Sequence, residues 1–182
     1  GPARERLADL VADLDDFELV GEAADGREAQ ELVERLAPDV VLMDVTDASS
    51  VTSVFKDIAT LDGLVTCAGI LLKDREWEIE GFEAVIDVNL NGLFFCCQAV
   101  APTMIAQGGG RIINIGSMYS NFGSGLIPSY TAAKWAIVQL TKSMAIELAP
   151  HNIQVNAIAP GWFKTDMTAP VRSADMKQMN DE

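Results

Sequence analysis

The stretch that decides the fold runs from residue 108 to residue 158 and reads GGGRIINIGSMYSNFGSGLIPSYTAAKWAIVQLTKSMAIELAPHNIQVNAI. A glycine turn leads into the apolar run Ile112–Ile115, a long helical pattern covers Ser129–Leu148, and a second strand pattern covers Ile153–Ile158. Two strands joined by a helix of this length pair in parallel, because the chain crosses over the sheet between them. The stretch therefore predicts an α/β fold.

The same alternation continues on the N-terminal side. Strand patterns are predicted at 17–20, 40–43 and 63–67, and helical patterns at 3–16, 27–36, 48–59 and, around Asn89, 82–107. Five strands separated by helices predict a doubly wound parallel sheet, Rossmann-like or flavodoxin-like, with helices on both faces.

Charge and composition exclude several classes of function. The 182 residues include 27 acidic and 13 basic side chains, a net charge of -14, so we expect no binding to nucleic acid. No uninterrupted apolar run approaches the roughly 20 residues of a membrane span, and no membrane partner is expected.

His151 is the only histidine, which excludes a His-based zinc site and a Ser-His-Asp triad, and no metal site is predicted. The cysteines, which form no CxxC pair, indicate reduced thiols in a cytoplasmic protein; they are Cys67, Cys96 and Cys97.

Tyr130 and Lys134 lie four residues apart on the predicted helix and therefore on one face of it. A tyrosine with a pKa of about 10 is a poor acid–base group at neutral pH, and a neighbouring ammonium lowers that pKa by favouring the phenolate. The pair is a candidate for general acid–base catalysis. Taken alone, the spacing is also typical of a solvated pair on a helix surface.

Several motifs, in order along the chain, resemble the short-chain dehydrogenase/reductase family. They are Val88–Gly92, Arg111–Ser117, Ser129–Lys134 and Asn156–Gly161, and the resemblance covers residues 44–168. It implies a catalytic set that acts with NAD or NADP on a small-molecule carbonyl or alcohol: Asn89, Ser117, Tyr130 and Lys134. In that family the tyrosine exchanges the substrate proton, the serine orients the substrate oxygen, the lysine holds the nicotinamide ribose, and the asparagine holds a water in a proton relay. Ser117 is also typical of a helix cap, and Asn89 of a polar helix residue bonded to backbone.

The resemblance also implies the residues that contact the cofactor. They are Asp44 and Val45 on the adenine side, Ala68 and Gly69 in a turn after a strand, and Tyr130, Lys134, Pro160, Gly161 and Thr165. Thr66 and Cys67 stand where the family's turn has two asparagines, and we expect this exchange to loosen the loop.

The glycine-rich turn of a dinucleotide fold is missing before Asp44. Such a turn lets the backbone approach a pyrophosphate at a helix N-terminus. Residues 21–26 (GEAADG) offer two glycines, with Glu22 and Asp25 between them, and those carboxylates repel a pyrophosphate. Cofactor binding is therefore expected to be weak or absent.

Residues 3–45 resemble a response-regulator receiver domain, with Asp44 at the phosphoacceptor position and Thr66 at a hydroxyl position. The acidic pair that places Mg²⁺ in that family is missing, so phosphorylation at Asp44 has little support. Asp44 is also typical of a polar residue at the end of a strand.

These features predict a chimera, engineered or recombined, in which a receiver-like fragment (1–45) and a truncated dehydrogenase part (46–182) share one core. The main hypothesis is a non-catalytic α/β scaffold. The alternatives are an active NAD(P)-dependent oxidoreductase and a receiver-type phosphorylation module. The tail ends before the last helix and strand of the dehydrogenase family. This leaves an unpaired edge or an apolar patch and predicts a homodimer or a swapped assembly through the helices that begin near Phe82 and Ser129.

Overall fold

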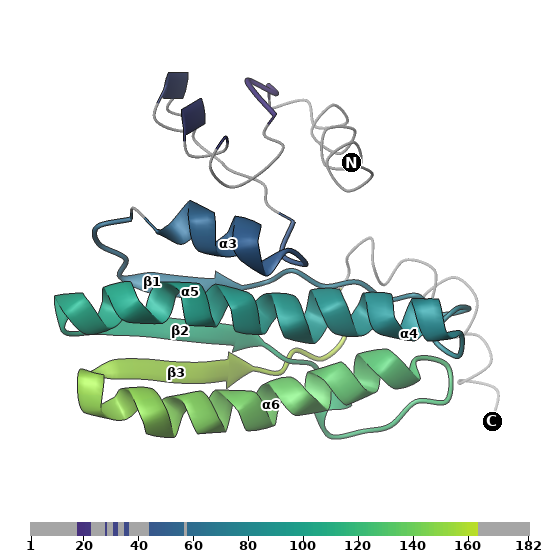
Figure 1. Ribbon diagram of the computed structural model, residues 1–182. Helices are drawn as coiled ribbons and strands as arrows, with labels where there is room; N and C mark the ends of the chain where they lie inside the picture. The colour runs from purple at the N-terminus through teal and green to yellow at the C-terminus, as the bar shows by residue number, and fades with distance from the viewer. Residues whose placement is uncertain are drawn as a thin grey trace.

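The computed structural model describes residues 18–22, 28, 31–32, 35–36, 44–56 and 58–163. Figure 1 shows how the strands and helices are arranged. In chain order the elements are α3 (Ala48–Phe55), β1 (Gly63–Thr66), α4 (Ile79–Ile86), the π-helical segment η1 (Asp87–Asn91), α5 (Gly92–Gln107), β2 (Gly110–Ile115), the 3₁₀ turn η2 (Met118–Ser120), α6 (Pro128–Leu148), the 3₁₀ turn η3 (Ala149–His151) and β3 (Ile153–Ile158).

The strands form a parallel sheet in the order β1-β2-β3. Gly63 pairs with Arg111, and Gly110 pairs with Ile153. All three carboxyl ends point the same way, towards the starts of α4 and α6 (Figure 1). The predicted α/β class with a parallel sheet is confirmed, and the carboxyl edge is where such a sheet places a ligand site.

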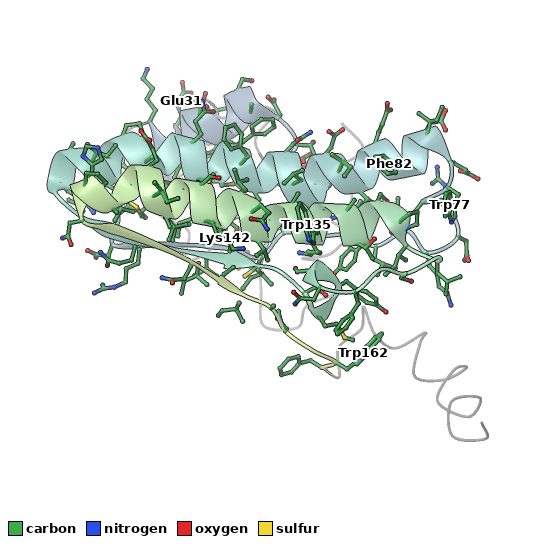
Figure 2. All side chains as sticks on the ribbon, turned by 90° about the horizontal axis from the view of Figure 1, so that it is seen from below. Glu31, Trp77, Phe82, Trp135, Lys142 and Trp162 are labelled. Carbon is green, nitrogen blue, oxygen red and sulfur yellow. The ribbon has the colours of Figure 1, made fainter. Side chains whose placement is uncertain are left out.

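The core lies between the sheet and the helices. Figure 2 shows that α5 and α6 cover the same face of the sheet. Burial of their apolar side chains against the strands is the main stabilising contribution. The core cluster consists of Leu93, Cys97, Val100, Met104, Ile112, Ile137, Leu148, Ile153 and Val155.

Local sequence explains where the helices begin and end. The Asp47 side chain caps α3 by accepting hydrogen bonds from the backbone N–H groups of Ser49 at 2.9 Å and Ser50 at 3.3 Å. α5 ends at Gly108, which has a φ of 84°, a left-handed conformation that glycine adopts without steric cost. At the start of α5, a Cβ on Gly92 would lie only 2.5 Å from the Val45 Cγ2 atom. Val45, three residues before the start of α3, can therefore pack directly on the α5 backbone.

A buried polar network ties the strands to α6. The Asn114 Oδ1 atom accepts a 3.0 Å hydrogen bond from the Thr66 hydroxyl, and its Nδ2 donates to the Thr141 hydroxyl at 3.0 Å. Thr141 in turn donates to the Ile137 carbonyl at 2.7 Å. A satisfied network of this kind holds the end of β1 at Thr66 in place, while the expected loosening of the loop after it stays a prediction.

Some predicted elements change. Residues 18–20 form no strand, so the strand predicted at 17–20 is wrong where the structure describes it. The described residues of the helix predicted at 27–36 are helical, whereas the helix predicted at 3–16 and the strand predicted at 40–43 lie outside the described residues. The helix predicted at 48–59 ends at Phe55, and the one predicted at 82–107 begins at Ile79. All three cysteines are free, as predicted.

One helical stretch, Ile79–Gln107, is long and apolar enough by length and composition to cross a membrane. Polar residues interrupt it, so no uninterrupted apolar run reveals it in the sequence. A helix of a protein core meets the same test, and here α5 packs against β1, β2 and α3. The finding is therefore weak evidence for a membrane span.

Candidate active site

Two ionisable side chains meet in the first turns of α6. The Lys134 Nζ atom lies 5.5 Å from the centroid of the Tyr130 ring. Lys134 is only 5% exposed, and its ammonium donates a 2.8 Å hydrogen bond to the Ile115 carbonyl at the end of β2. The structure brings the pair together as the spacing predicts. The burial of the lysine argues against the alternative of a solvated pair.

Burial shifts the pKa of both groups. Burial raises the pKa of Tyr130 above 10.0, a hydrogen bond with Ser117 lowers it in part, and the charges of Tyr119 and Glu76 raise it further. Burial also lowers the pKa of Lys134 from 10.5 to about 8. The pKa of Tyr130 is therefore raised on balance, because desolvation disfavours the phenolate, and a lowering by Lys134 stays a prediction.

Ser117 connects β2 to this pair. Its hydroxyl accepts a 3.2 Å hydrogen bond from the Tyr119 N–H and so caps η2, as the structural alternative predicts, and it also bonds to the Tyr130 side chain. The Ser120 hydroxyl donates to the Lys134 carbonyl at 2.6 Å. η2 is therefore fastened to α6, and Ser117 is held beside Tyr130.

Asn89 lies in η1 and is 1% exposed. Its Nδ2 donates 2.9 Å hydrogen bonds to the Val85 and Ile70 carbonyls, as a polar helix residue bonded to backbone would. Its Oδ1, however, is buried without a partner among the described residues. A Cβ on Gly69 would lie 2.9 Å from that oxygen and 3.9 Å from the Lys134 Nζ atom. A buried acceptor without a partner, close to the same glycine as an ammonium, suits a bound water or a ligand hydroxyl.

Aromatic rings line one side of Tyr130. The Tyr119 ring lies 6.2 Å from the Tyr130 ring and 6.3 Å from the Trp162 ring, each edge to face, which is a favourable geometry for aromatic pairs. Trp162 is 57% exposed and lies beyond the end of β3, on the side of the sheet away from the helices (Figure 2). We call Tyr119, Tyr130 and Trp162 the aromatic wall.

The chain after β3 is held to the chain after β2. The Gly116 N–H donates to the Ile158 carbonyl at 2.7 Å, and the Met118 N–H donates to the Pro160 carbonyl at 2.9 Å. Pro160 thus lies next to η2, while a Cβ on Gly161 would meet nothing within 4 Å. Thr165 lies outside the described residues.

The other cofactor contacts implied by the resemblance lie on the N-terminal side. The Asp44 carboxylate accepts hydrogen bonds from the Thr46 N–H at 3.0 Å and from its hydroxyl at 2.8 Å. This local bonding agrees with Asp44 as a polar residue closing a turn. Ala68 follows β1 in an exposed loop. Residues 23–27 lie outside the described residues, so the interpretation of 21–26 as a poor phosphate loop stays a prediction.

Sequence reasoning missed Glu76. This carboxylate is 1% exposed and accepts hydrogen bonds from the Ser129 hydroxyl at 2.7 Å and the Tyr130 N–H at 2.9 Å. In the sequence it is one of several acids between residues 74 and 80. The only signal is indirect: Ile127 precedes Pro128 where a helix normally has a capping side chain.

With this geometry, the chain belongs to the short-chain dehydrogenase family. A model of that family, described as short chain dehydrogenase, matches residues 16–176. The match includes the sheet, the polar residues at its carboxyl edge and the start of α6.

Individual relatives narrow the comparison. The chain is similar to the 5-keto-D-gluconate 5-reductase of Escherichia coli (strain K12), with 44% identity over 122 residues, 66% of this chain and 48% of the reductase. It is similar to the 3alpha-hydroxysteroid dehydrogenase of Mediterraneibacter gnavus, with 36% identity over 162 residues, 84% of this chain and 65% of that protein. Among solved structures it is similar to a gluconate 5-dehydrogenase from Burkholderia cenocepacia in complex with NADP and tartrate, with a TM-score of 0.71, 32% identity, and coverage of 85% of this chain and 65% of that one. The chain thus spans about half the length of the reductase.

These comparisons bear on the predicted chimera. The family match runs through Asp44 and Val45, where the joint between two parents is expected. The comparisons give no support for a receiver-domain fragment or for a chimera. They also give no support for weak or absent cofactor binding, since one similar protein was solved with NADP.

Proposed function

We propose that this chain is an NAD(P)-dependent oxidoreductase that interconverts a carbonyl and an alcohol on a small molecule. The observation that carries the proposal is the cluster at the carboxyl edge of the sheet. There the Tyr130 hydroxyl bonds to Ser117, and the buried Lys134 ammonium and the unpaired Asn89 Oδ1 atom both lie within 4 Å of the place where a Cβ on Gly69 would be. The family match supports this alternative over the non-catalytic scaffold.

Tyr130 is proposed to transfer the proton. Its raised pKa keeps the phenol protonated at neutral pH, which suits donation to a carbonyl oxygen during reduction. Ser117, bonded to the same hydroxyl, orients that oxygen. General acid catalysis of this kind contributes about 10²- to 10⁴-fold to the rate.

Lys134 and Asn89 are proposed to resupply the proton. The lysine, with a pKa lowered to about 8, can release and regain a proton near neutral pH. The Asn89 Oδ1 atom can accept a hydrogen bond from a water near the lysine, and such a water would bring a proton from solvent into the buried site.

The residues present fit the nicotinamide half of NAD(P). The Lys134 ammonium and the Tyr130 hydroxyl would hold the ribose, and Gly69 leaves open a space that a Cβ would fill close to Asn89. The bound cofactor supplies the hydride that reaches the carbonyl carbon. By family resemblance we assign the remaining contacts to Asp44, Val45, Ala68, Pro160, Gly161 and Thr165.

A keto or hydroxy sugar acid is the substrate class we propose, because the reductase and the gluconate 5-dehydrogenase carry such names. The aromatic wall favours a second candidate, a ketone on an apolar ring, since aromatic faces bury such rings well. The similarity to a 3alpha-hydroxysteroid dehydrogenase points the same way.

The first test is a fluorescence titration of the protein with NADH and with NADPH. The second measures the reduction of 5-ketogluconate and of a 3-ketosteroid. We expect saturable binding of one cofactor and turnover of one substrate class. Tyr130→Phe should lower kcat by about 10²- to 10⁴-fold, while Tyr119→Phe, which keeps its ring in the aromatic wall, should retain turnover. If neither cofactor binds and neither substrate is reduced, the result would support the scaffold hypothesis instead.

A further inference from the structure

Glu76 is a buried carboxylate outside the proposed catalytic set. Its Oε1 atom accepts a 3.0 Å hydrogen bond from the Leu72 N–H, and its Oε2 atom accepts from the Ser129 hydroxyl and the Tyr130 N–H. All three partners donate, and both oxygens accept. An ionised carboxylate, which has acceptors only, matches this environment.

α6 lacks a capping side chain of its own. Its N-cap residue, Ile127, makes no side-chain hydrogen bond, and Pro128 occupies the first helical position. Tyr130 is the third helical residue, so its N–H is one of the groups that have no partner within the helix. A capping side chain normally accepts from this N–H. Glu76, more than fifty residues earlier in the chain, takes that place.

We propose that Glu76 is a positioning residue for Tyr130, because its carboxylate caps α6 from outside and fixes the backbone that carries the proposed acid. The inference rests on the proposed function and deepens it. A second contact strengthens the attachment: the Trp77 Nε1–H donates to the Gly125 carbonyl at 2.8 Å. Trp77 lies close to the start of α4 in Figure 2, so the segment 72–77 is joined to the segment 125–130 at two points.

The negative charge of Glu76 also acts on Tyr130. The groups that face this phenol are Lys134 from α6, Ser117 and Tyr119 from the chain after β2, and Glu76. Burial raises the pKa of Tyr130 most, and the charge of Glu76 raises it further. Removing the charge stabilises the phenolate and lowers that pKa. An uncharged cap, such as the amide of the Glu76→Gln variant, would not have this effect.

The test compares Glu76→Gln, Glu76→Ala and the control Glu78→Gln in the full chain. Glu78 lies in the same segment, but its carboxylate is exposed and pairs with Arg75 at 3.4 Å. One arm measures kcat and its pH profile per folded molecule. The other measures the ionisation of Tyr130 by near-ultraviolet absorbance in a Tyr119→Phe background. The chain has two tyrosines, so this background leaves one to titrate, and the arm needs no activity.

We expect Glu76→Gln to shift the Tyr130 midpoint and the alkaline limb of reduction to lower pH, and Glu76→Ala to lower kcat by about 100-fold through misplacement of the acid. Glu78→Gln should match the parent. An unmoved tyrosine midpoint in Glu76→Gln overturns the proposal, even if Glu76→Ala fails to fold. A parent that turns over no substrate contradicts the proposed function, and the absorbance arm then still decides the role of Glu76.

Discussion

Replacing Lys134 with methionine is expected to stabilise the folded protein at about pH 7 while it removes activity. Lys134 is almost fully buried, and within the described part of the chain its ammonium donates a hydrogen bond to the Ile115 carbonyl. Burial penalises the charged form, which is why the pKa of Lys134 falls. Methionine has a similar length and no charge, so it can occupy the same space at little packing cost.

The magnitude follows from the lowered pKa. A fall from 10.5 to about 8 means that holding the charged lysine costs about 3 kcal/mol of unfolding free energy at neutral pH. The variant leaves the Ile115 carbonyl without its donor, which costs about 1 kcal/mol. The net gain is therefore about 2 kcal/mol. Between about pH 8 and 10.5 the folded parent binds fewer protons than the unfolded parent, so the parent becomes more stable as pH rises and the gain disappears.

Urea denaturation of parent and variant at about pH 7 and about pH 10 measures this directly. Lys142→Met is the matched control, because Lys142 lies two turns further along α6 with an exposed side chain (Figure 2). The unfolding free energy of this control variant should equal that of the parent at both pH values. A Lys134→Met variant that is less stable than the parent by the same amount at both pH values would refute the reasoning.

Three further outcomes are expected. Cys67 should be alkylated in the folded protein, and the other two cysteines only in urea, because burial protects them and raises their pKa; intact mass counts the adducts. Thr66→Val should lower the unfolding free energy by about 1 to 3 kcal/mol, since Asn114 loses a buried donor, as urea denaturation will report. Trp135, 56% exposed on α6, should lie in the expected dimer surface, so Trp135→Glu should shift sedimentation velocity from dimer to monomer; a parent that sediments as a monomer at all concentrations contradicts this.

The elements around β2 and α6 are predictable from local sequence because strong signals bound them. Gly108 ends α5, and Pro128 begins α6 within one residue of the predicted start. The strand predicted at Ile153–Ile158 is confirmed at both ends. The strand predicted at 17–20 fails where it is described, since a short apolar run carries no period that distinguishes a strand from an extended loop.

Local sequence predicts that Tyr130 and Lys134 come together, but it does not predict the direction of their pKa shifts. Helical spacing brings Tyr130 and Lys134 together, whereas the sign of their pKa shifts depends on burial by segments distant in sequence. For the same reason Glu76 is invisible to a local pattern, because its partners, Ser129 and Tyr130, lie more than fifty residues away. Contacts between residues so far apart in the sequence leave no regular spacing that a sequence pattern could reveal.

The π-helical segment η1 determines the direction in which the side chains of α5 point relative to those of α4. A π turn holds one residue more than an α turn. The side chains of α5 therefore point about 100°, one residue step, away from where an uninterrupted α-helix through α4 would place them. Asn89 is buried within this turn, and the buried side of α5 that begins at Gly92 follows it directly. If the same residues formed a regular α-helix instead, every later side chain of α5 would turn by that angle, whereas deleting one residue between Asp87 and Asn91 would restore a regular α-helix and leave those side chains facing as they do now. A single-residue deletion in η1 is therefore expected to preserve the buried side of α5, whereas the same deletion inside α5 would turn every side chain beyond it by about 100°.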